Sequence, residues 1–322
     1  MDFERPVSEL ENQIRELRSQ TSNKNIDFSQ EIAALEAKVN QMLEDIYKKL
    51  TPWERTQLSR HPMRPHSIDY IEKIVTDFHE VHGDRRFSDD PSMITGFGFI
   101  DGQKVAVIGI EKGRKTQEKI KRNFGMANPE GYRKALRVMQ LASQFNIPVI
   151  TFVDTPGAYP GIGAEERGQA LAIAQNIEEM FNIKSPIVSI IIGEGGSGGA
   201  LGIAVADKVF MMEYSVYSVI SPESCASILW SDPKMAETAA NSLQLSPAKA
   251  LELKVVDGVI KEPSGGAHRY PDQAIEKVKE AVMNSLNALI KEDTDLMMQK
   301  RFEKFRQMGN TTITVDSEDG KE

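Results

Sequence analysis

Residues 148–163 read PVITFVDTPGAYPGIG, and this stretch decides the fold class. Its first six residues form a short apolar run of the kind that is buried on both faces of a sheet. A glycine-rich turn follows at residues 154–163, and a helical pattern continues over residues 164–181. A strand, a turn and a helix in this order predict one unit of a parallel α/β sheet.

The same unit recurs further along the chain. Residues 187–192 form a second apolar strand, residues 193–199 read GEGGSGG, and a short helix over residues 198–206 precedes a third strand at residues 208–212. On the N-terminal side, strands at residues 93–100 and 104–110 flank Asp101-Gly102, the signal of a tight type I′ hairpin. A helix over residues 129–145 leads from there to the first strand. These elements predict a layered α/β core with right-handed crossovers.

Helical periodicity dominates both ends of the chain. Apolar residues at three- and four-residue spacing predict amphipathic helices over residues 7–17 and 32–50, separated by polar residues 21–25. A capping box at residues 51–54 starts a third helix, and a fourth is expected from residue 67 to about residue 81. Further helices are expected at residues 222–230, 234–243, 247–253 and 272–308, followed by a loose acidic tail at residues 311–322.

Composition narrows the class of protein. The 322 residues are 40% hydrophobic and 27% charged, as in soluble globular proteins, and no apolar run reaches the ~18 residues that span a bilayer. The single cysteine, Cys225, excludes an internal disulfide framework and is interpreted as a packed small apolar residue. Acidic residues at the N-terminus argue against a secretory signal, so a cytoplasmic location is expected. The net charge of -8 argues against generic nucleic-acid binding.

One segment is basic, in contrast to the net negative charge of the chain. Residues 112–122 read KGRKTQEKIKR, with six basic residues and a single acid, Glu118. A polyanionic ligand would be expected at such a segment. A solvated basic loop explains the same pattern equally well.

Both glycine-rich turns follow strands and lead into helices. At the carboxyl ends of parallel strands, glycines let backbone N–H groups approach an anion or a developing oxyanion at a helix N-terminus. Six glycines lie between Gly193 and Gly202, more than tight packing alone would require. Asp154, at the end of the first strand, fits either a general base or a turn-forming residue.

Short motifs overlap in the second turn. Gly193-x-Gly195-x-x-Gly198 fits a dinucleotide fingerprint, with Glu213 about 20 residues on, although the following helix is short and the turn lies deep in the chain. Ser197, in Gly195-x-Ser197-x-Gly199, fits a nucleophile elbow that Asp232 or Asp257 together with His268 would complete. The lysine of a Walker A motif is absent, which excludes a P-loop.

The histidines carry less information. His79 and His82, with Asp84, can be drawn as a metal site, but such loose ligand spacing is common by chance. Surface or capping roles explain these histidines better.

Longer stretches are more specific than any of these motifs. They are KRNFGMANPEGYRKALRVMQLA (121–142), ITFVDTPGAYPGIGAEERGQA (150–170), IIGEGGSGGALGIAVADKV (191–209) and YSVYSVISPESCASILW (214–230). Together they closely resemble the carboxyltransferase alpha subunit of bacterial acetyl-CoA carboxylase, over almost the whole chain. The resemblance implies an α/β, crotonase-like (ClpP/crotonase) fold, a spiral of ββα units with N-terminal and C-terminal helices. We expect a helical arm over residues 1–26, a carboxyltransferase domain over residues 27–295, and a C-terminal helix end with an acidic tail over residues 296–322.

The resemblance also implies a reaction and partners. A carboxyl group would pass from carboxybiotin on the biotin carboxyl carrier protein to acetyl-CoA, giving malonyl-CoA in the first committed step of fatty acid biosynthesis. The chain itself would bind no cofactor covalently and no metal, and ATP would be used by the biotin carboxylase component. Such enzymes share the active site between this subunit and a carboxyltransferase beta subunit in an α2β2 assembly. The chain alone should therefore be catalytically incomplete.

The roles of individual residues follow from the same resemblance. The backbone N–H groups of Gly198 and Gly199 would stabilise the ureido oxygen of biotin, and the beta subunit would stabilise the enolate of the thioester. No side-chain base is then required, because the biotin can take the methyl proton itself. The other substrate-binding candidates are Gly195, Gly196, Ser197, Gly157, Ala158 and, to meet a carboxylate, Arg167.

The resemblance suggests two specific ligands for the basic segment. Lys119, Lys121 and Arg122 would meet the phosphates of CoA or an acidic face of the carrier protein. The alternative function from a different class is a serine hydrolase that uses Ser197 and His268. A noncatalytic scaffold subunit is the third alternative.

Overall fold

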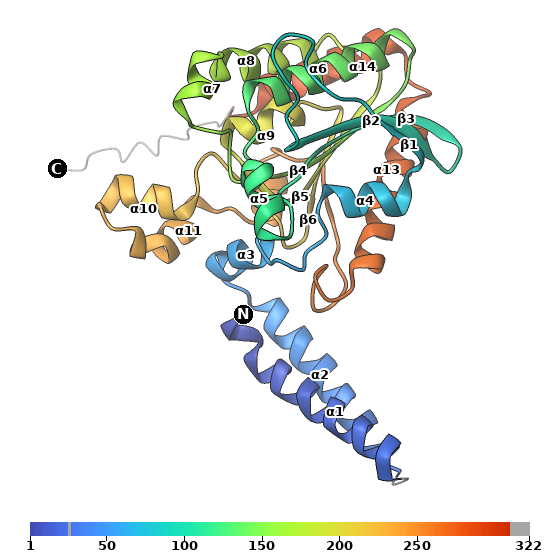
Figure 1. Cartoon of the computed structure of the whole chain (residues 1–322), viewed down its shortest axis with the longest axis vertical. Coiled ribbons are helices and arrows are strands. Elements are labelled where there is room, and N and C mark those ends of the chain that lie inside the picture. The colour runs from blue at the N-terminus through green and yellow to red at the C-terminus, as the bar shows by residue number, and fades with distance from the viewer. Residues whose placement is uncertain (25–26, 310–322) are drawn as a thin grey trace, which may run out of the picture.

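The computed structural model describes residues 1–24 and 27–309. Its centre is a sheet with the strand order β1-β2-β3-β4-β5-β6-β8, and β7 pairs with the end of β5 (Figure 1). The strands β1 to β3 are antiparallel neighbours, and all pairs from β3 onward are parallel. The strands are β1 (Thr76–Glu80), β2 (Met93–Ile100), β3 (Gln103–Ile110), β4 (Val149–Thr155), β5 (Ile187–Gly196), β6 (Lys208–Met212), β7 (Val216–Ser218) and β8 (Gly258–Ile260).

Helices cover both faces of the sheet (Figure 1). On one face, α6, α8 and α9 pack on a core that includes Ile108 and Val153, and on the other, α4 and α13 pack on a core that includes Val107 and Phe152. Residues from the same strand thus point alternately into two cores, as expected for strands buried on both sides. The helices of this body are α3 (Pro52–Ser59), α4 (Ser67–Ile74), α5 (Thr116–Lys121), α6 (Pro129–Gln144), α7 (Ile162–Glu166), α8 (Gln169–Met180), α9 (Ser197–Ala204), α10 (Pro222–Trp230), α11 (Ala236–Leu243), α12 (Pro247–Glu252), α13 (Pro271–Leu289) and α14 (Thr294–Gln307).

Two sequence signals are confirmed in detail. Asp101 and Gly102 have φ angles of 48° and 79°, and both positive values fit the type I′ turn that joins β2 to β3. Thr51 accepts a hydrogen bond from the backbone of Glu54, whose side chain accepts one from the backbone of Thr51, so the predicted capping box starts α3. Cys225 is also buried, against Ala226 and Ala239, as predicted.

The N-terminal helices α1 (Arg5–Lys24) and α2 (Ser29–Lys48) form an antiparallel hairpin that extends from the body (Figure 1). Apolar residues of both helices, Val7 and Ile14 with Val39 and Leu43, form their own small core. Residues 21–24, expected to separate the two helices, are instead part of α1, which continues to Lys24, and Asn25 lies outside the described residues.

Three helix boundaries differ from the prediction. The helix expected to reach about residue 81 ends at Ile74, and β1 follows because residues 76–80 pair with the edge of β2. The helix expected over residues 164–181 is two helices, since Gly168 has a φ of 79° that a continuous helix cannot accommodate. The helix expected over residues 272–308 is also two, α13 and α14, because Asp293 caps a new start.

The acidic tail predicted at residues 311–322 lies outside the described residues. Within the part of the chain that the structure describes, no helix combines the length and the apolar character that crossing a membrane requires.

Candidate active site

The two glycine-rich turns lie side by side at the carboxyl ends of the parallel strands β4 and β5. A Cβ atom added at Gly196 would lie 2.2 Å from the carbonyl oxygen of Pro156. One added at Gly199 would lie 2.6 Å from the backbone nitrogen of Ala158. Because backbone meets backbone at both points, glycine is required there, and the first turn supports the second.

Helix α9 begins inside the second turn. Ser197 is its first residue, with a left-handed φ of 52°, and Gly198 and Gly199 form its first turn. Its N-cap residue, Gly196, makes no side-chain capping hydrogen bond. The first N–H groups of a helix lack intrahelical acceptors and lie at the positive end of its dipole. This end of α9 can therefore donate backbone hydrogen bonds to an anion or a developing oxyanion.

A pocket of about 240 Å³ lies beside this helix end. It is lined by Ser197, Gly198, Leu201, Tyr217, Ser218, Val219 and Val255. The nearest atom to a Cβ added at Gly198 would be Cγ2 of Ile173, at 3.6 Å, which is an ordinary contact. Gly198 thus has room beside its backbone, unlike Gly199, and a ligand in the pocket could approach it closely.

Charged side chains hold the ends of the same strands together. The Lys112 ammonium lies 2.7 Å from Oδ1 of Asp154 and 2.6 Å from Oε2 of Glu194. Glu194 also accepts a bond from Arg60 Nε at 2.5 Å, and Arg60 in turn pairs with Glu223. Lys112, Glu194 and Arg60 were not predicted from the sequence as parts of the site. The acidic residue within a buried, glycine-rich strand end was a signal that could have indicated them.

The network fixes the ionisation of its members. Burial alone would lower the pKa of Lys112, but the carboxylates of Asp154 and Glu194 raise it above its ordinary value. Burial alone would raise the pKa of Glu194, but Lys112 and Arg60 lower it. Both groups are therefore charged at neutral pH.

Asp154 takes neither of the two roles left open by the sequence. Its Oδ1 accepts the backbone N–H of Glu194 at 2.9 Å and bonds Lys112, so it is engaged within the protein and joins two strand ends. The turn that follows is closed by Thr155, whose Oγ1 accepts the N–H of Gly157 at 3.0 Å. These contacts give Asp154 a structural role.

Arg167 is held by other residues of the body. Its Nη2 donates to Oε1 of Glu130 at 2.9 Å, and its guanidinium lies 4.6 Å from the centre of the Phe87 ring. The hydrogen bond that Arg167 donates to Glu130 raises the pKa of Arg167. Its charge is thus already compensated, which weakens the expectation that it meets a substrate carboxylate.

The basic segment does not form one surface. Lys112 is part of the internal network, Arg114 pairs with Asp69, and Arg122 donates to the carbonyl of Pro91 at 2.6 Å. Lys119 and Lys121 lie on the short helix α5, and Lys121 is exposed. Only part of the segment can therefore face an anionic ligand.

The residues that the serine hydrolase interpretation requires each contact a different part of the protein. Ser197 borders a pocket whose lining contains no histidine or carboxylate. His268 lies 3.3 Å from Glu4, and Asp232 accepts the N–H of Lys234 at 2.9 Å. Asp257 accepts the N–H of Val209 at 2.7 Å and a bond from Lys304.

Glu213, the acid of the dinucleotide interpretation, is also engaged within the protein. It bonds Lys261 at 2.7 Å and accepts the backbone N–H of Glu262 at 3.0 Å. A ribose hydroxyl would have to compete with both of these bonds.

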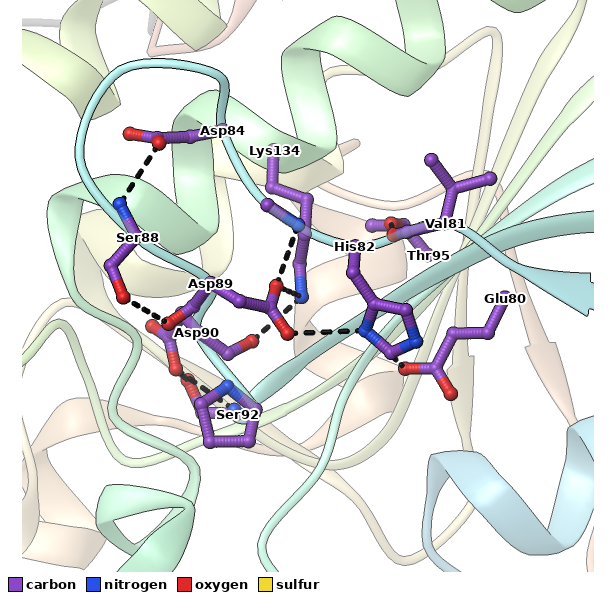
Figure 2. Close-up of polar contacts among 12 residues, drawn as sticks. Glu80, Val81, His82, Asp84, Ser88, Asp89, Asp90, Ser92, Thr95 and Lys134 are labelled. Atoms are coloured by element: carbon purple, nitrogen blue, oxygen red, sulfur yellow. Dashed lines mark hydrogen bonds and ion pairs between the residues drawn. The ribbon is translucent and has the colours of Figure 1, made fainter.

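The histidines drawn as a metal site do not converge with the nearby acid. Figure 2 shows His82 directed at Asp89 and Glu80, while Asp84 bonds the backbone of Ser88. Asp84 also binds Arg133 at 2.7 Å. His79, in β1, is exposed.

Within the described residues, one other group has the composition of a metal site, namely Glu4, His61 and His268. Oε1 of Glu4 already accepts bonds from Tyr47 at 2.7 Å and Arg269 at 3.1 Å. Arg269 brings a positive charge to the same oxygen. The carboxylate of this group therefore binds an arginine side chain.

Solved structures with a similar fold include a transcarboxylase, a carboxylase subunit and a decarboxylase. Transcarboxylase 12S matches with a TM-score of 0.59 and 18% identity, over 71% of this chain and 42% of that chain. The beta subunit of geranyl-CoA carboxylase from P. aeruginosa matches with a TM-score of 0.54 and 19% identity, over 71% of this chain and 43% of that chain. A malonate decarboxylase heterodimer from Pseudomonas matches with a TM-score of 0.54 and 13% identity, over 68% of this chain and 89% of that chain. The fold is thus the crotonase-like α/β fold of carboxyltransferases, as expected.

Sequence comparison is more specific. Residues 1–309 match the family described as acetyl co-enzyme A carboxylase carboxyltransferase-like. The acetyl-coenzyme A carboxylase carboxyl transferase subunit alpha of Fusobacterium nucleatum is 54% identical over 309 residues, which cover 96% of this chain and 99% of that protein. The subunit of the same name from Thermus thermophilus is 50% identical over 96% of this chain and 98% of that protein. The chain belongs to the family of acetyl-CoA carboxylase carboxyltransferase alpha subunits.

Proposed function

We propose that this chain provides the site at which carboxybiotin gives up its carboxyl group to acetyl-CoA, with the product malonyl-CoA. The observation that carries this proposal is the uncapped N-terminus of α9, held against residues 157–158 beside a pocket. In the overall transfer, a C–N bond to biotin breaks, a C–C bond to the acetyl methyl carbon forms, and the methyl proton passes to the biotin nitrogen. The chain's own task is to stabilise the negative charge that biotin gains.

The N–H groups of Gly198 and Gly199 would perform this task. They are oriented before the reaction begins, so no reorganisation is needed as charge develops. Gly195, Gly196 and Ser197 would contact the substrate beside these donors, and residues 157–158 lie against the backbone of Gly199. The donors fit a ureido oxygen, since the helix end carries no acidic side chain of its own in its first turn.

The partners of the reaction would include a carboxyltransferase beta subunit. Large apolar side chains are exposed in the single chain, among them Val219 of the pocket at 76%, and Ile228 and Leu229 of α10 at 72% and 62%. The helices α10 and α11 also stand out from the body (Figure 1). Exposed apolar surface of this kind is typical of a protein that binds another. The biotin carboxyl carrier protein and biotin carboxylase would complete the ATP-dependent complex.

The test is malonyl-CoA formation from acetyl-CoA and carboxybiotin by this chain alone, with a beta subunit, and with the Gly198→Pro variant. Proline at residue 198 removes one N–H donor. Because proline disfavours a helical conformation in the residue before it, and Ser197 has a φ of 52°, assembly of the variant is measured alongside its activity. Activity only in the mixture, reduced at least about 100-fold by Gly198→Pro, would support the proposal. An assembled Gly198→Pro complex with full activity would contradict the role of this N–H group.

The two lysines of α5, of which Lys121 is exposed and Lys119 half-buried, are tested separately. We propose that Lys119 and Lys121, with Arg122, attract the CoA phosphates or the carrier protein. Reversing all three charges should raise the Michaelis constant for one of the two substrates and leave kcat nearly unchanged. Unchanged Michaelis constants for both substrates would remove this role.

A further inference from the structure

Lys112 joins the ends of three neighbouring strands. It lies two residues after the end of β3, and its ammonium lies between Asp154 of β4 and Glu194 of β5, at 2.7 Å and 2.6 Å. Since β3, β4 and β5 are parallel, these residues lie at the same edge of the sheet, where both glycine-rich turns begin. The side chains of all three are largely buried, with 15%, 4% and 10% exposed for Lys112, Asp154 and Glu194.

Two glycines make room for this ion cluster. A Cβ added at Gly125 would lie 2.7 Å from Cγ of Lys112, and one added at Gly193 would lie 2.4 Å from Oδ1 of Asp154. The same Oδ1 accepts the N–H of Glu194 at 2.9 Å. The backbone around the cluster is therefore shaped to bring the two carboxylates and the lysine together.

Other charged groups face the cluster from neighbouring elements. Arg60, at the end of α3, bonds Glu194 and pairs with Glu223 of α10. Arg64 and Tyr70 lie close enough for Asp154 to act on their ionisation, and Arg64 is itself paired with Glu262 at 2.6 Å. With Arg60 shared with Glu223 and Arg64 with Glu262, Lys112 is the cation that Asp154 and Glu194 have in common.

We propose that Lys112 is a positioning residue for carboxyl transfer. It neutralises Asp154 and Glu194, so that the ends of β4 and β5 stay in register and hold the first turn of α9 against residues 157–158. This inference rests on the proposed function, because it assigns Lys112 an action through the N–H groups of Gly198 and Gly199. A displacement of such donors by about 1 Å is enough to cost about 100-fold in rate.

Removing the ammonium has a consequence that simple loss of packing does not have. Two carboxylates in one buried site repel each other, and uptake of a proton by one of them relieves this repulsion. A shared proton would then join Asp154 and Glu194 again. A variant without Lys112 should therefore regain activity as the pH falls, opposite to a protein that is merely less stable.

The experiment compares Lys112→Met with the wild-type chain, each assembled with the beta subunit. We expect kcat at pH 8 to fall about 100-fold, the Michaelis constant for acetyl-CoA to stay within about 3-fold, and the loss to shrink to about 10-fold at pH 6. Lys112→Arg, which keeps the charge, should recover most of the activity at pH 8. Lys279→Met is the matched control, because it removes a Lys–Asp pair of 2.7 Å, with Asp101, at the hairpin turn that lies at the opposite end of β3.

A double variant separates charge from packing. Lys112→Met with Glu194→Gln leaves one carboxylate in place of two, and we expect its kcat at pH 8 to exceed that of Lys112→Met by at least about 10-fold. If Lys112→Met does not assemble with the beta subunit, the kcat of the double variant tests the inference instead. Wild-type kcat and pH dependence in Lys112→Met would overturn the inference, and so would an equal loss at every pH that Glu194→Gln does not relieve. An inactive wild-type mixture would instead contradict the proposed function.

Discussion

The guanidinium of Arg301, on α14, binds both carboxylate oxygens of Asp207, at 2.8 Å and 2.6 Å, in the interior of the protein. Arg301 also donates to the carbonyl groups of Met180, Ile183 and Ser185, and Asp207 accepts the N–H of Ile187 at 2.7 Å. The C-terminal helix is thus attached to the start of β5 and to the residue before β6. The strand that carries the second glycine-rich turn is fixed at its far end by this pair.

Replacing Arg301 should therefore destabilise the whole body. Arg301→Met leaves the buried carboxylate of Asp207 without its cation, which typically costs about 3–5 kcal/mol. Urea unfolding of the purified chain measures the loss. Arg306→Met, on the exposed side of the same helix, should change the stability by less than about 0.5 kcal/mol. Equal stability of the two variants would contradict the structural role of the Arg301–Asp207 pair.

The N-terminal arm is attached to the body by a buried acid, and this attachment should depend on pH. Burial alone would raise the pKa of Glu4, but bonds from His268 and Tyr47 outweigh it and lower the pKa to about 2. A carboxyl whose pKa is lower in the folded state stabilises the fold above its unfolded pKa of 4.5, and this contribution is lost as the pH falls from 4.5 to about 2.

His61 makes the stability of the fold depend on pH at higher pH values as well. Burial and the neighbouring His268 lower the pKa of His61 to about 4. Its neutral form is favoured in the folded state, so stability is lost as the pH falls from the ordinary 6.5 toward 4. Urea midpoints at pH 7, 5 and 3 should fall in two stages. Glu4→Gln should remove the lower stage, whereas Glu9→Gln, in an exposed pair with Arg5, should leave both.

Ser197 should be dispensable as a nucleophile. Ser197→Ala keeps the backbone donors of α9, so malonyl-CoA formation by the assembled complex should stay within about 10-fold of wild type. A serine hydrolase would lose more than about 1000-fold and would also be labelled by a serine-directed phosphonate. Mass spectrometry of the chain after treatment with the phosphonate measures this directly, and a labelled Ser197 would revive the hydrolase interpretation.

The structural features that were predicted best from the sequence are those that depend on a local pattern. The paired turn of Asp101 and Gly102, the buried strands and both glycine-rich turns are recognisable because each signal lies within a few neighbouring residues. Strand β1 was missed since Asp77 has a positive φ and a register shift interrupts the pairing between Thr76 and His79. Such a bulge removes the period of two on which strand prediction depends.

The charged part of the site required the fold. Lys112 stood in the sequence as the first of six basic residues, which suggested a ligand surface, whereas its partners lie 42 and 82 residues further on. Asp154 and Glu194 become neighbours only because β4 and β5 pair in parallel. A charge run indicates where charge is, but not which buried group neutralises it.

The two glycines of the α9 first turn should respond differently to alanine. At Gly199, a Cβ would meet the backbone of Gly157 and Ala158 at 2.6 Å, so Gly199→Ala must push the two turns apart. At Gly198, the nearest contact would be Ile173 at 3.6 Å, and the N–H is retained. We therefore expect kcat of the assembled complex to fall at least about 100-fold in Gly199→Ala and less than about 10-fold in Gly198→Ala.

The comparison is informative because the two changes are chemically identical and adjacent in the chain. Steady-state malonyl-CoA formation gives kcat, and thermal unfolding shows whether each variant remains folded. A large loss in Gly198→Ala with little loss in Gly199→Ala would mean that access to the pocket limits the reaction more than the contact between the turns. The larger loss in Gly199→Ala would instead show that the first turn holds the N–H donors in place, because that contact is the one a Cβ at residue 199 disrupts.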